Sequence, residues 1–127
     1  SKKIQLESQL PEIVNEDERF LLSVNKYIDE YMEDTDLSIE ALSKSMYVSR
    51  GTLYNKLLAL TGETPVEYVR SRKLIRAAIL LEKSDMKISQ IAYSVGFSNP
   101  NYFARAFKAK YNVSPTEYIA RFKKDKS

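Results

Sequence analysis

This chain of 127 residues contains neither histidine nor cysteine. The side chains that could do chemistry in it are therefore other charged or polar groups. Without histidine the chain lacks the commonest general base and the commonest transition-metal ligand. Without cysteine it has no thiolate metal site and no disulfide framework. We therefore predict that the chain is not an enzyme, that it has no catalytic or metal-binding residues and that it needs no cofactor. The chemistry that remains is hydrogen bonding and charge.

Polar side chains gather on the outer faces of two short segments with helical spacing. In the first segment Leu53 and Leu57 form the inner face, and in the second Phe103 and Phe107 do so. The first outer face consists of Arg50, Gly51, Thr52, Tyr54, Asn55 and Lys56. The second consists of Asn99, Pro100, Asn101, Ala104, Arg105 and Lys108. Such outer faces are either merely solvated or used for binding, and their repetition at matching positions favours binding.

The hydrogen-bonding groups on these faces match those of nucleic acid. The Arg105 guanidinium can pair with guanine through two parallel hydrogen bonds, and the amide of Asn55 or Asn101 can pair with adenine. Helix N-termini together with hydroxyl, amide and basic groups suit phosphates. The predicted phosphate-contacting residues are Ser49, Arg50, Thr52, Asn99, Tyr102 and Lys108.

The elements that carry these faces are repeated along the chain. Ser38 can cap a short helix, Tyr47-Val48-Ser49 interrupts the apolar pattern, and a second helix follows until Gly62. The apolar positions recur at a shift of 49 or 50 residues, with one extra residue in the second turn, at 96–99. A short helix, a tight turn and a second helix make a helix-turn-helix unit, whose second helix enters the major groove. We predict two such units, at about 38–62 and 87–113.

A long helix is predicted between the two units, at about 65–83. It opens with a capping box, Thr64-Pro65-Val66-Glu67, which recurs as Ser114-Pro115-Thr116-Glu117. Nineteen residues at about 1.5 Å each span roughly 28 Å, and successive major grooves are about 34 Å apart. The chain is therefore predicted to be all-α, with two helix-turn-helix subdomains joined by a long central helix and about seven helices in total. It would reach two adjacent major grooves without dimerising.

Charge divides the chain into an acidic and a basic half. Residues 1–69 carry a net charge of −6 and residues 70–127 carry +9. A basic half favours a polyanionic partner, although chance segregation of solvated charge gives the same totals. The sequence contains no run of about eighteen apolar residues, so no membrane span is predicted.

The remaining segments lie outside the repeat. Residues 1–16 are predicted to be a tether, 17–124 the domain and 125–127 a tail. The first helix, at about 17–34, ends in acidic residues where the helix dipole prefers cations, so compensation from elsewhere is expected. The candidates lie on the long helix, and they are either such partners or phosphate clamps. They are Arg70, Arg72, Lys73 and Arg76.

Two other classes of function are weaker. A helical protein-interaction module would explain the acidic half but neither the repeat nor the basic half. An enzyme would need a hard-cation site made of carboxylates, and acidic runs of this kind are usually solvated surface. The carboxylates in question are Asp29, Glu30, Glu33, Asp34 and Asp36.

These motifs resemble the DNA-binding domain of the AraC family of bacterial transcription regulators. The resemblance is most specific in IAYSVGFSNPNYFARAFKAKYNVSPTEY and extends through LSIEALSKSMYVSRGTLYNKLLALTGETPVEYVRSRKLIRAA. It implies seven helices, the fourth linking the two units, and sequence-specific binding of double-stranded promoter DNA. The positions it implies for base contacts are Gly51, Tyr54, Asn55, Pro100, Asn101, Ala104 and Arg105. Gly51 stands where a larger side chain is common.

The same resemblance implies partners outside this chain. The stretch SRGTLYNKLLALTGETPVEYVRSRKLIRAA is similar to the output domains of two-component regulators, including hybrid sensor kinases. It implies a transcriptional activator in the bacterial cytoplasm that works with RNA polymerase and makes no membrane contact through this part. A receiver or sensory domain would precede it, and any dimer would form through the longer protein.

Overall fold

The computed structural model describes residues 15–35 and 37–126, with side chains described as far as Lys123. Within these residues the chain forms seven helices and no strand. They are α2 (Glu16–Glu30), α3 (Ile39–Ser45), α4 (Arg50–Thr61), α5 (Pro65–Lys83), α6 (Ile88–Ser94), α7 (Pro100–Tyr111) and α8 (Pro115–Lys126). The prediction of an all-α fold with about seven helices is confirmed.

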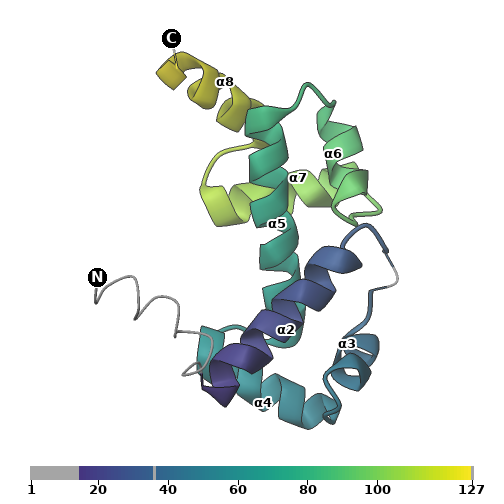
Figure 1. The fold of residues 1–127 in the computed structure, drawn as a ribbon. Coiled ribbons are helices and arrows are strands. Elements are labelled where there is room, and N and C mark those ends of the chain that lie inside the picture. Colours follow the sequence, from purple (N-terminus) through teal and green to yellow (C-terminus); the bar gives the residue numbers. More distant parts are fainter. Residues whose placement is uncertain (1–14, 36, 127) are drawn as a thin grey trace, which may run out of the picture.

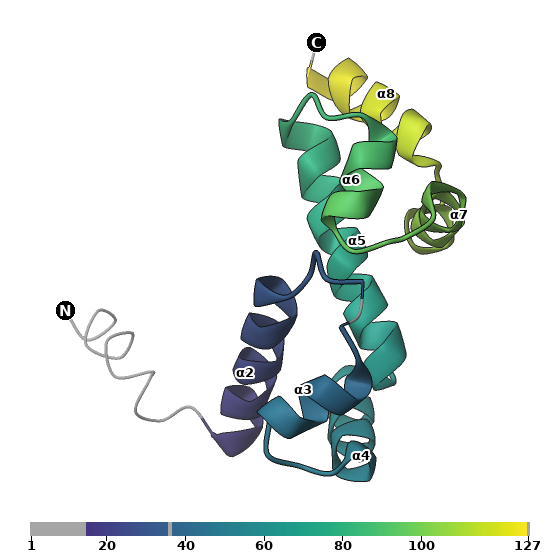
Figure 2. The ribbon, with the colours of Figure 1, turned by 90° about the vertical axis from the view of Figure 1, so that its right-hand side faces the viewer.

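The helices form two groups joined by α5. Figure 1 shows α5 running along the long axis, with α2, α3 and α4 around one end and α6, α7 and α8 around the other. The view in Figure 2 shows the same division. We call α2–α4 the first head and α6–α8 the second head. Helix α5 packs against both, because it contacts α2 and α4 as well as α6, α7 and α8.

Local sequence explains where these helices begin and end. Ser38 Oγ accepts a hydrogen bond from Ala41 N at 3.0 Å and caps α3, and Ser49 Oγ accepts one from Thr52 N at 3.1 Å and caps α4. Helix α4 ends at Thr61 and is followed by Gly62, whose φ of 78° lies in the left-handed region. The corresponding residue after α7, Asn112, has φ 67°.

The capping box predicted for α5 is complete. Thr64 Oγ1 accepts from Glu67 N at 3.3 Å, and Glu67 Oε1 accepts from Thr64 N at 2.9 Å. These hydrogen bonds lower the pKa of the Glu67 carboxyl, because they stabilise its ionised form. The second copy begins in the same way, with Ser114 Oγ accepting from Glu117 N at 3.1 Å.

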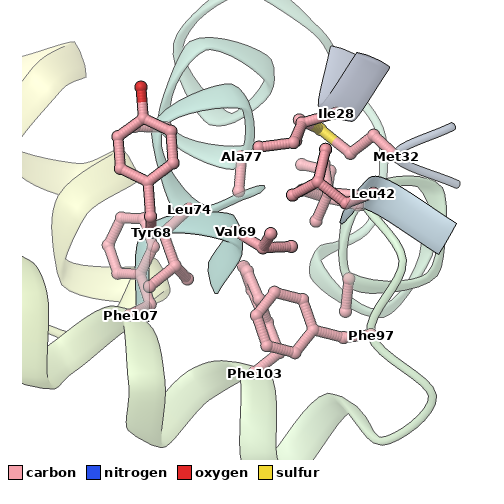
Figure 3. Close-up of a cluster of buried hydrophobic side chains, with 14 of the residues drawn as sticks. Ile28, Met32, Leu42, Tyr68, Val69, Leu74, Ala77, Phe97, Phe103 and Phe107 are labelled. Carbon is pink, nitrogen blue, oxygen red and sulfur yellow. The ribbon is translucent and has the colours of Figure 1, made fainter. Parts of the chain in front are cut away.

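One hydrophobic core runs through both heads. The four predicted inward residues, Leu53, Leu57, Phe103 and Phe107, have no exposed surface. Figure 3 shows how the cluster continues from Ile28, Met32 and Leu42 of the first head, past Val69, Leu74 and Ala77 of α5, to Phe97, Phe103 and Phe107 of the second. The heads therefore share buried surface with α5 and with each other.

Three predicted boundaries were wrong. The first helix begins at Glu16, one residue inside the predicted tether, and ends at Glu30, not at 34. Acidic side chains crowd this end against the negative pole of the helix dipole, and the chain leaves the helix through a turn in which Asp34 N donates to Tyr31 O at 3.0 Å. Helix α8 continues to Lys126, into the predicted tail, because a helix can extend past its last apolar position. The rest of the predicted tether, residues 1–14, lies outside the described residues, as does Ser127.

None of the described helices is both long enough and apolar enough to cross a membrane.

Candidate nucleic-acid interface

Helix α4 presents most of its predicted outer face to solvent. Arg50, Gly51, Thr52, Tyr54 and Asn55 are all exposed. Their exposure follows from the burial of the opposite face of the helix in the core.

Lys56 does not belong to this exposed face. It is only partly exposed, and its Nζ lies 4.6 Å from the centre of the Phe20 ring on α2. A cation over an aromatic face is attracted to it. The sequence pattern put Lys56 outside because it did not show that α2 packs beside α4.

Helix α7 presents a row of three hydrogen-bonding side chains. Asn101, Arg105 and Lys108 are exposed and follow one another at intervals of four and three residues, which places them on one helical face. Pro100 and Ala104 are half-buried, so they flank this row. All seven predicted base-contacting residues therefore lie on α4 and α7, but Pro100 and Ala104 are less exposed than the other five.

The predicted phosphate-contacting residues at the helix starts also serve as caps. Asn99 Oδ1 accepts from Asn101 N at 2.8 Å and from Tyr102 N at 3.2 Å. The Ser49 hydroxyl donates to Thr52 Oγ1 at 3.0 Å while it accepts from Thr52 N. Among the side chains in these hydrogen bonds, the donors left for a phosphate are therefore the Asn99 NH₂ group and the Thr52 hydroxyl.

The turns of the two units differ although they occupy equivalent positions. Tyr47 and Gly96 both have left-handed backbones, with φ 59° and 88°. Tyr47 is 95% exposed, whereas Gly96 is buried, and a Cβ atom placed on Gly96 would lie 2.1 Å from Met32 O. The turn of the second unit thus packs directly on the end of the first head, which holds the two heads together.

The basic residues of α5 have separate partners. Arg72 Nη2 pairs with Asp29 Oδ1 at 3.3 Å, which supplies the expected compensation at the acidic end of α2. Lys73 Nζ donates to Gly96 O at 3.3 Å, and burial lowers the pKa of its ammonium group while the nearby Asp34 carboxylate acts in the opposite direction. Arg70 Nη1 donates to the Tyr102 hydroxyl at 3.3 Å.

The last of these contacts was not predicted. Arg70 and Tyr102 are 32 residues apart in sequence, and no local pattern pairs them. The sequence predicted a separate role for each, with Arg70 as a charge partner or phosphate clamp on the long helix and Tyr102 as a phosphate contact.

The acidic run does not form a cation site in the part of the chain that the structure describes. There, no group of three or more carboxylates is arranged to hold a metal ion. Asp36, the fifth residue of the run, lies outside the described residues.

The fold and its exposed helices define a helical DNA-binding domain with two helix-turn-helix units. A family model described as "Helix-turn-helix domain" matches residues 42–121. The chain belongs to this family, and it is an AraC-family DNA-binding domain. Such domains are DNA-binding transcription regulators and not enzymes.

Relatives and solved structures agree with this assignment. The chain is 41% identical over 106 residues to histidine kinase P4 of Formosa agariphila, a match that covers 84% of this chain and 8% of the kinase. It is 31% identical over 110 residues to the transcriptional activator RhaS of Salmonella schwarzengrund, covering 87% of this chain and 39% of RhaS. It therefore spans less than half the length of either relative. The DNA-binding domain of AdpA, solved in complex with a target DNA, is 27% identical with a TM-score of 0.76, over 83% of this chain and 94% of that domain.

Proposed function

We propose that this domain reads two adjacent major grooves of promoter DNA, α4 entering one groove and α7 the other. The observation that carries the proposal is the pair of exposed polar helix faces on one continuous core. The contacts of α5 with both heads, and the packing of the second turn on Met32, support a single relative position for the two helices. A single chain can then present both to one face of the duplex.

Within this proposal the side chains have two roles. In α7, Arg105 and Asn101 read bases from one face, with Ala104 and Pro100 in apolar contact beside them. In α4, Tyr54 and Asn55 read bases, and Gly51 leaves room for the DNA without offering a side chain. The phosphate-contacting residues are Arg50, Thr52, Asn99, Tyr102 and Lys108, and Ser49 joins them when its hydroxyl turns from Thr52 Oγ1 to the phosphate.

Selection of bound duplexes from a random DNA pool, at about physiological salt, tests this function. We expect enrichment of a bipartite motif whose two blocks lie about one helical turn apart. A single short block would mean that only one helix reads bases. No enrichment by a folded protein would overturn the proposal and favour a protein-interaction module.

We also propose that the domain is the activating output part of a longer cytoplasmic signalling protein. The support is the similarity to an activator, RhaS, and to a histidine kinase of which the matching part is 8% of the length. RNA polymerase and a preceding receiver or sensory domain are the partners this implies, with dimerisation through that longer protein. A reporter gene placed behind the selected motif tests it: transcription should rise with the signal that reaches the full-length protein, and a fall would indicate a repressor.

A further inference from the structure

A groove lies between the two heads. It has a volume of about 360 Å³, and its sides come from different heads: Ser38 and Ile39 at the start of α3 on one side, Phe97 and Ser98 of the second turn on the other. Helix α5 contributes Arg70 and Lys73 to the lining, and α7 contributes Tyr102. We call this the inter-head groove.

The two charged side chains that line the inter-head groove are both basic, because α5 divides its basic residues between two faces. Arg70 and Lys73 are three residues apart and share the face that lines the groove. Arg72 points to the other side, where it pairs with Asp29, and Arg76 lines a separate hollow beside Asp29, Glu30 and Glu33. The acidic residues of α2 therefore lie beside the face of α5 that carries Arg72 and Arg76. The opposite face, with Arg70 and Lys73, lines the inter-head groove.

The groove also lies beside the elements that meet DNA in a helix-turn-helix unit. The first helix of such a unit crosses the backbone, and the second enters the major groove with its N-terminus. The start of α3 and the first turn of α7, which holds Tyr102, form parts of the two sides. If α4 and α7 occupy successive major grooves, the DNA that lies between them passes this point.

We propose that the inter-head groove binds backbone phosphates of the DNA segment between the two major grooves, with Arg70 and the Tyr102 hydroxyl as direct ligands. Arg70 donates one N–H to the Tyr102 oxygen, which leaves the hydroxyl proton and further guanidinium N–H groups to donate to phosphate oxygens. Lys73, whose Nζ donates to Gly96 O, adds a second basic group to the lining, with the Asp34 carboxylate nearby. This inference rests on the proposed two-groove function.

The test compares Arg70→Gln with Arg72→Gln, which removes the same charge from the opposite face of the same helix. Affinity for the selected bipartite DNA is measured by fluorescence anisotropy at several salt concentrations. Loss of one phosphate contact should reduce the slope of log affinity against log salt by about 0.9. We expect this change for Arg70→Gln and not for Arg72→Gln, with discrimination against a scrambled duplex unchanged for both. Equal slopes for wild type and Arg70→Gln would overturn the inference.

A second measurement locates the phosphates. Uncharged methylphosphonate linkages are placed between the two blocks of the DNA, and in a control duplex at one outer end. Central linkages should weaken wild-type binding severalfold and weaken Arg70→Gln clearly less, because only the Tyr102 hydroxyl then remains as a direct ligand. Equal weakening of both proteins would show that Arg70 does not contact these phosphates. If the wild-type protein selects no bipartite DNA, the proposed two-groove function is wrong. If it does select bipartite DNA but Arg70→Gln binds that DNA as wild type does, only the phosphate-binding role of the inter-head groove is wrong.

Discussion

The substitution Gly96→Ala should destabilise the protein by more than the backbone cost of placing alanine in a left-handed conformation. The residue has φ 88°, and an added Cβ would lie 2.1 Å from Met32 O and 2.9 Å from Lys73 Nζ. A left-handed backbone costs a residue with a Cβ about 1–2 kcal/mol. Forcing an extra carbon into a packed contact costs roughly 1–3 kcal/mol more. The expected loss is therefore about 2–5 kcal/mol.

Two control variants separate these contributions. Gly62 has φ 78°, and a Cβ added there would meet nothing within 4 Å, so Gly62→Ala should lose only the backbone part, about 1–2 kcal/mol. Tyr47 has the equivalent place in the first unit, with φ 59°, and is 95% exposed. Tyr47→Gly relieves the backbone and loses little packing, but glycine costs about 0.5–1 kcal/mol in entropy. We expect it to stay within about 1 kcal/mol of wild type.

Urea unfolding followed by circular dichroism measures all three. The reasoning is refuted if Gly96→Ala loses no more stability than Gly62→Ala, because the contact with Met32 would then carry no cost. A further consequence concerns the joint between the heads. A Gly96→Ala protein that remains folded should accept a wider range of spacings between the two DNA blocks than wild type does.

Four more variants test the site and the core. Arg105→Ala should weaken binding to the preferred DNA by roughly 1–3 kcal/mol and relax specificity at one base pair, whereas Lys108→Ala should weaken binding to all sequences alike. A competition assay with single-base variants of the DNA measures both effects, and the reverse result would mean that Lys108 reads a base and Arg105 contacts a phosphate. Phe107→Ala removes a fully buried ring and should lower the free energy of unfolding in urea by about 3–5 kcal/mol; an unchanged midpoint would contradict its place in the core. Burial, with the hydrogen bond and charge of Glu82, raises the pKa of Tyr118 to about 12. Since the unfolded phenol ionises near 10, stability should be lost as the pH rises from about 10 through 12, and Tyr118→Phe should lose less over that range in urea titrations at each pH.

Much of the fold could be predicted from the sequence because it depends on local chemistry. The caps at Ser38, Ser49 and Thr64 involve residues three apart, and their hydrogen bonds form whatever lies further away. The spacing of Leu53 and Leu57, and of Phe103 and Phe107, gives one inner face per helix, and all four are buried. The sequence repeat then predicted that the two units have the same order of helices, and this prediction does not depend on how the units pack together. The helix ends near Glu30 and Lys126 were predicted less well, because the apolar pattern marks a face and not a boundary.

The sequence by itself determined the helices, their buried faces, the order of the two units and, apart from Lys56, which polar residues face outward along α4 and α7. Only the tertiary structure decided how the basic residues of α5 are used, because their partners are distant in the chain. Arg72 pairs with Asp29 across 43 residues, Arg70 contacts Tyr102 across 32, and Lys73 reaches Gly96 across 23. Helical periodicity specifies the direction of each side chain from its own axis. It does not specify which other helix lies there, and that depends on how the shared core packs the two heads around α5.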